Sequence, residues 1–60
     1  MTEAEEKGME FFETEPELLV AAVWHVAAKQ YPELDIQREF VNGYITARRR
    51  RDEYQQEKRE

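Results

Sequence analysis

The hydrophobic residues of this chain are concentrated in its middle. Twenty of them lie between Phe11 and Ala47, and four lie outside that segment. The run from Leu18 to Ala28 is interrupted only by His25, and on a helix its apolar residues would cover almost the whole circumference. A helix that is apolar all round must be covered all round. We therefore expect a helix over about residues 15–30 that one neighbouring helix cannot bury.

Local signals set the expected ends of this central helix. Thr14-x-x-Glu17 has the spacing of a capping box, and Pro16 would lie in the first turn, where a missing N–H costs little. Tyr31-Pro32 should end the helix, because the residue before a proline is pushed out of the helical region.

A second, longer helix is predicted over about residues 36–57, with Asp35 as its N-cap. A helical stripe recurs along it at spacings of three and four residues and consists of Ile36, Phe40, Tyr44, Ala47, Arg51 and Tyr54. Asn42-Gly43 could also form a turn, but the stripe stays in phase across it, which favours one continuous helix. Small residues on this face would let another helix approach closely.

Charge divides the sequence into three parts. Residues 1–17 carry a net charge of −6, residues 18–47 carry −1, and residues 48–60 form a basic tail with +2. Residues 1–13 form either a solvated acidic arm or a short helix. The spacing Thr2-x-x-Glu5 predicts a helix start there, whereas Gly8 weakens a helix by about 1 kcal/mol relative to Ala.

These patterns predict an all-α fold in a single domain, residues 1–60. We expect a small antiparallel helical hairpin over residues 14–57, preceded by the acidic arm or short helix. The apolar segment is 37 residues long, and chains below roughly 40 residues usually need disulfides, a metal or oligomerisation to stay folded. Self-association or a partner should therefore complete the fold.

Composition narrows the possible chemistry. The chain has no Cys, no Ser and one His, which excludes disulfides, a cysteine zinc site and a serine or cysteine nucleophile. The helical neighbours of His25 are Ala21, Ala22, Ala28 and Lys29, so it lacks local metal-ligand partners. We expect His25 to be an interface or rim residue. The glutamates lie in a segment with little apolar material to shift their pKa values, so we predict no enzyme, no metal and no cofactor.

The start of the sequence is acidic, whereas targeting segments begin with positive charge. The longest apolar stretch is shorter than the roughly 20 residues that a membrane span needs. We expect a cytoplasmic protein that does not act at a membrane.

The preferred functional hypothesis is a protein-protein interaction module, acting as a small accessory, regulatory or inhibitory factor. Its partner is another protein or a second copy, with a homodimer expected. The apolar helical face would be flanked by acidic residues, and large aromatic residues are favoured anchors in interfaces. The interface residues predicted from the sequence are Leu19, Val23, Trp24, Val26, Phe40 and Tyr44.

Four consecutive arginines allow three interpretations. Arg48, Arg49, Arg50 and Arg51 could form a solvated helix end, pair with acidic residues of a partner or of the chain itself, or bind phosphate. The last option supports an alternative function, a dimeric helix-turn-helix-like nucleic-acid-binding regulator that also uses Gln37, Arg38 and Asn42. The expected loop is longer than the tight turn of that motif, and the net charge of −5 opposes phosphate approach.

Overall fold

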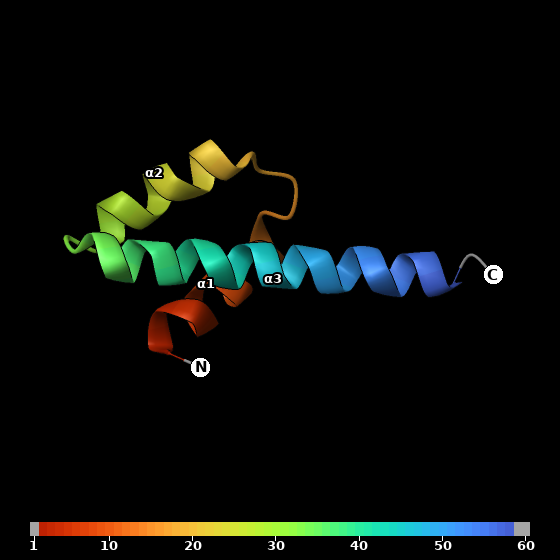
Figure 1. Ribbon diagram of the computed structural model, residues 1–60. Helices are drawn as coiled ribbons and strands as arrows, with labels where there is room; N and C mark the ends of the chain where they lie inside the picture. The colour runs from red at the N-terminus through yellow and green to blue at the C-terminus, as the bar shows by residue number, and fades with distance from the viewer. Residues whose placement is uncertain (1, 59–60) are drawn as a thin grey trace.

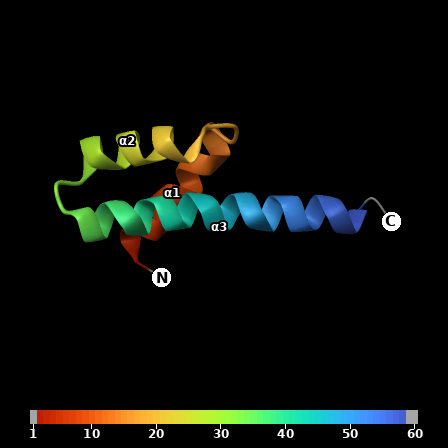
Figure 2. The same ribbon diagram turned by 45° about the horizontal axis from the view of Figure 1, so that its top comes forward.

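The computed structural model describes residues 2–58, and all its regular structure in that range is helical. Helix α1 spans Glu3–Thr14, α2 spans Val20–Gln30 and α3 spans Leu34–Lys58. The long helix α3 is central: α1 and α2 pack against it from different sides, and within the described residues they do not pack against each other (Figure 1). The C-terminal part of α3 extends beyond both shorter helices (Figure 2).

Helix α1 settles the choice between an arm and a helix for the N-terminal residues. The hydroxyl of Thr2 accepts a hydrogen bond from the N–H of Glu5 at 3.2 Å, as the capping spacing predicts. Three glutamates in the first turn are favourably placed near the positive end of the helix dipole. The acidic segment therefore starts as a capped helix packed on α3.

Two glycines mark the place where α1 crosses α3. A Cβ added to Gly8 would lie 2.0 Å from the carbonyl oxygen of Phe40, and one added to Gly43 would lie 2.1 Å from that of Glu5. The two backbones are therefore in direct contact, which only glycine permits at these positions. The predicted close approach of a helix at Gly43 is confirmed, and α3 runs through Asn42-Gly43 without a turn.

The predicted start of the central helix is wrong. Thr14 does not cap α2 but ends α1, where its hydroxyl donates to the carbonyl of Phe11 at 2.9 Å. Glu15, which precedes Pro16, has φ −135° and ψ 72° and leaves the helical region. Helix α2 begins only at Val20, and the side chain of its N-cap residue, Leu19, makes no capping hydrogen bond.

The turn between α2 and α3 is shorter than expected. Tyr31 leaves the helical region before Pro32, as predicted, but α3 already begins at Leu34, so Asp35 lies in its first turn rather than at the N-cap. Only residues 31–33 connect the helices. The side-chain amide of Gln37 donates to the carbonyl of Tyr31 at 2.8 Å and ties α3 to the end of α2.

All three helices contribute to the core. Its buried hydrophobic residues are Ala4, Phe12, Val23, Ala27, Phe40, Val41 and Tyr44. Five aromatic rings form a connected cluster within and beside it, through the pairs Phe11–Phe40, Phe11–Tyr44, Phe12–Tyr44 and Tyr31–Phe40. Helix α1 thus packs on the predicted stripe of α3, and most of the aromatic residues serve the chain's own core.

Two further sequence predictions concern membrane-spanning segments and the basic tail. No helix in the part that the structure describes is both long and apolar enough to cross a membrane. The predicted basic tail covers residues 48–60; its residues up to 58 continue α3, and residues 59–60 lie outside the described range.

Candidate interaction surface

Helix α2 buries one side against α3 and leaves the other side uncovered. Val23 and Ala27 are completely buried. On the opposite side of the helix, a continuous exposed surface, here called the α2 face, consists of Ala21, His25 and Ala28, with the half-buried Trp24 at its edge and Lys29 beside it. Leu19 lies beside it at the start of the helix and is 79% exposed. Trp24 is half-buried because part of its side chain packs against the core.

The α2 face differs in charge from the rest of the surface. Helix α2 contains no carboxylate, and Lys29 near its C-terminal end is its one basic residue besides His25. By contrast, α1 exposes Glu3, Glu6, Glu10 and Glu13 to solvent. Contiguous exposed apolar surface is a marker of interaction sites.

The six residues predicted as a partner interface fall into two groups. The core contains Val23, Phe40 and Tyr44, which are at most 1% exposed. The surface retains Leu19, Trp24 and Val26, of which Leu19 is exposed and the other two are half-buried. In this conformation the first group cannot reach a partner. Helical periodicity places residues on a common face, but it does not say whether the same chain supplies the neighbour.

The linker between α1 and α2 is held in place by one tyrosine. The hydroxyl of Tyr44 accepts a hydrogen bond from the N–H of Leu18 at 3.0 Å and donates to the carbonyl of Glu15 at 2.6 Å. One buried side chain on α3 thereby satisfies two backbone groups in a segment without regular structure. This fixes the direction in which the chain enters α2.

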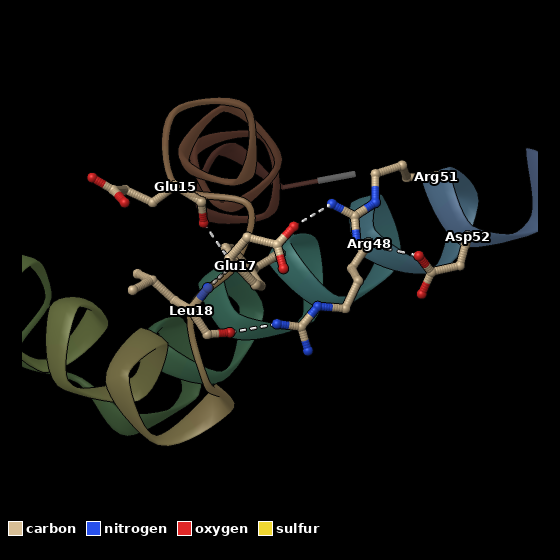
Figure 3. Close-up of polar contacts among 7 residues, drawn as sticks. Glu15, Glu17, Leu18, Arg48, Arg51 and Asp52 are labelled. Carbon is tan, nitrogen blue, oxygen red and sulfur yellow. Dashed lines mark hydrogen bonds and ion pairs between the residues drawn. The ribbon is translucent and has the colours of Figure 1, made fainter. Parts of the chain in front are cut away.

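Two of the four consecutive arginines, Arg48 and Arg51, also contact the linker, from the same face of α3 as Tyr44. The guanidinium of Arg48 donates to the carbonyl of Leu18 and lies 5.4 Å from the centre of the Tyr44 ring (Figure 3). Arg51 forms ion pairs with Glu17 at 3.1 Å and with Asp52 at 3.2 Å. Tyr44, Arg48 and Arg51 together, the linker clamp, hold residues 15–18 against α3 and present Leu19 outward.

Arg51 has a mixed environment. It lies over the ring of Phe12 at 5.1 Å, and its Nε is buried without a hydrogen-bond partner. Burial by itself would lower the pKa of Arg51, but hydrogen bonds and charge from Asp52 and Glu17 outweigh it and raise that pKa above its ordinary value. The guanidinium therefore stays charged and forms its ion pair with Glu17 of the linker.

The residues proposed for nucleic-acid contact are also divided. Gln37, Arg48 and Arg51 bond to the chain itself, as described above. Arg49 and Arg50 are exposed, as are Arg38 and Asn42. Arg38, Asn42 and Arg49 share the outer side of α3 by their spacing of four and seven residues. The basic surface of α3 that could contact nucleic acid is therefore smaller than the sequence predicted.

A shallow hollow lies where the start of α1 meets the α2–α3 turn. Its volume is about 300 Å³, and it is lined by Thr2, Glu3, Ala4, Tyr31, Ile36 and Glu39. The hydroxyl of Thr2 is already engaged in capping α1. Among the described residues, no group of three side chains of the metal-binding types is close enough to hold an ion.

The Arg51–Glu17 ion pair matches one of the three interpretations of the arginine run, whereas the bonds of Tyr44 and Arg48 to the linker backbone were not predicted from the sequence. The spacing of residues 44, 48 and 51 already put three polar-tipped side chains on one helix face, which was the available signal. Their targets are about 30 residues away: backbone groups for Tyr44 and Arg48, and the carboxylate of Glu17 for Arg51. Comparison of the chain with family models, with curated proteins and with solved structures gives no match.

Proposed function

We propose that this chain is a non-enzymatic protein-interaction module, a small accessory, regulatory or inhibitory factor that binds its partner through the α2 face and Leu19. The observation that carries the proposal is the uncovered apolar side of a helix whose other side is fully buried. Leu19 supports it further, because an exposed leucine at an N-cap position contributes neither a cap nor core packing.

The surroundings of the face indicate the chemistry of the partner. Glu15 and Glu17 are exposed in the linker directly before α2. A matching surface would be an apolar helix with a basic residue opposite this linker. Such a charge at the rim of an interface would guide association and orientation more than it would add affinity.

A site-specific photocrosslink tests this function. A photoreactive phenylalanine analogue replaces Ala21 in the full chain, which is expressed in its native cells, and crosslinked products are identified by mass spectrometry. We expect a discrete product that disappears when Ala28→Glu is added, since the charge would enter the apolar contact. The same probe at Asn42, exposed on α3, is the matched control. Equal crosslinking from both positions, or none from Ala21, would contradict the proposal.

The alternative function is nucleic-acid binding, favoured by two observations. The α2–α3 turn has only three residues, a length found in helix-turn-helix motifs, and Arg38, Asn42 and Arg49 share an exposed side of α3. This function requires a salt-dependent mobility shift with duplex DNA or RNA that Arg38→Ala and Arg49→Ala weaken. No binding at low salt, where the electrostatic contribution is greatest, would reject it.

A further inference from the structure

We infer that the α2 face binds a second copy of this chain, with the two α2 helices antiparallel and crossing between Trp24 and His25. This inference rests on the proposed function and adds the identity of the partner. In a twofold dimer the same patch is used on both subunits and must be complementary to itself. The exposed sides of α1, α2 and α3 differ in how well each could meet a second copy of itself.

The distribution of charge selects α2 among these surfaces. A twofold contact through α1 would bring its exposed glutamates against those of the other copy. A contact through the outer side of α3 would have to desolvate Arg38, Asn42 and Arg49. Desolvation of charged groups is costly unless they are paired closely. The α2 face contains no carboxylate or arginine, and Lys29 lies beside it at the end of the helix, so two copies meet there with less desolvation of charge.

Residue size along the α2 face defines the register. With the twofold axis between Trp24 and His25, each Trp24 lies opposite His25 of the other copy, and each Ala21 lies opposite Ala28 of the other copy. Small residues facing each other at both ends let the helices approach closely. The large, half-buried indole then packs beside an imidazole near the centre, and aromatic side chains in that position are frequent anchors of interfaces.

The charges near the two ends of α2, Lys29 at one end and the linker glutamates at the other, also suit this arrangement. Two Lys29 side chains would lie nine residue positions apart along the paired helices, about 13 Å at 1.5 Å per residue, which exceeds the Debye length at physiological salt. Each Lys29 would instead lie near the N-terminal end of the other α2, where Glu15 and Glu17 are exposed. The antiparallel register thus separates like charges and brings opposite charges together.

The length of α2 limits the strength of the dimer. Eleven residues give a helix about 16 Å long. Its exposed side is smaller than the roughly 800 Å² per subunit of a standard interface, so we expect a weak, reversible dimer. The chain would then exchange between monomer and dimer at moderate concentrations.

Sedimentation equilibrium on the full chain, from about 5 µM to 1 mM, tests the dimer. The expected result is a monomer–dimer equilibrium, and a monomer throughout this range would overturn the inference. Ala21→Glu and Ala28→Lys should each weaken association at least about tenfold, because each places a charge in the apolar contact. Asn42→Glu on α3 is the matched control and should leave it unchanged. Circular dichroism at low concentration verifies that each variant remains folded.

Mixing the two charged variants tests the register. Ala21→Glu in one chain would face Ala28→Lys in the other, so an equimolar mixture should form a heterodimer more tightly than either variant associates alone. No gain on mixing, or wild-type association by Ala21→Glu alone, would overturn the antiparallel arrangement. If the wild type is monomeric but the Ala21 photocrosslink captures a different protein at this face, the dimer fails while the proposed function stands.

Discussion

Gly8 lies so close to Phe40 that the carbonyl oxygen of Phe40 occupies the place where a Cβ on residue 8 would project. This contact sets how near α1 comes to α3, and through that approach it sets the depth at which Phe12 and Ala4 enter the core. A glycine that weakens the isolated helix therefore makes the helix pair possible.

Gly8→Ala should destabilise the chain. In an exposed helix this change would stabilise by about 1 kcal/mol, but here the added methyl group must force the helices apart, and we expect a loss of about 2 kcal/mol or more. Urea denaturation followed by circular dichroism measures it. Lys7→Ala, at the exposed neighbouring position, is the control and should change stability by less than about 0.5 kcal/mol. A more stable Gly8→Ala variant would show that the backbones do not touch.

Tyr44→Phe should cost about 1–3 kcal/mol, because the Leu18 N–H and the Glu15 carbonyl both lose their partner while the ring remains. Amide hydrogen exchange should accelerate at Leu18 in particular. Tyr31→Phe keeps its ring beside Phe40 and is the matched control, with an expected change within about 0.5 kcal/mol. Unaltered exchange at Leu18 would mean that the hydroxyl does not hold the linker.

The ion pair between Arg51 and Glu17 should contribute to stability in a salt-dependent way. Glu17→Gln and Arg51→Gln are expected to lower the unfolding midpoint, the double variant less than the sum of both, and the coupling should shrink as salt rises from about 0.05 to 1 M. The exposed pair Lys7–Glu10, at 3.8 Å, is the reference and should couple more weakly. Coupling that is equal in both pairs would contradict a clamp role for Arg51.

Leu19→Asn separates stability from binding. An asparagine can supply the side-chain cap that α2 lacks, so we expect a gain of about 0.5–1 kcal/mol, measured by denaturation at low protein concentration. The same change removes an exposed apolar side chain beside the α2 face and should reduce the Ala21 photocrosslink. Leu19→Ala, which adds no cap, should reduce crosslinking without the gain in stability. A destabilised Leu19→Asn would indicate that Leu19 has a structural role.

Local signals in the sequence were reliable where one short segment determines its own conformation. Thr2 caps α1, Pro32 ends α2 at the expected place, and the uninterrupted stripe on α3 outweighs the turn tendency of Asn42-Gly43. The same kind of signal failed at Thr14. Two helix-boundary tendencies compete there, and the packing of Phe12 in the core keeps Thr14 as the end of α1.

The candidate interaction surface could be predicted only in part. The sequence identified α2 as a helix without a polar side. Because α2 packs against one helix, α3, some of its apolar residues remain exposed. It could not tell that Val23, Phe40 and Tyr44 are buried by the chain itself, since Tyr44 meets residues 26 and 29 positions away. Nor could it show that Arg48 and Arg51 bind the linker whereas Arg49 and Arg50 point to solvent.

The sequence by itself determined the helical class, the apolar character of α2 and the separation of charge along the chain, because these depend on residue type and on periodicity within one element. Only the tertiary structure decided which helix covers which face. The contact of Gly8 with Phe40 and the clamp on the linker join residues far apart in the chain, and their energies depend on how closely whole helices pack. That packing places α1 on one side of α3 and leaves the α2 face open on the other.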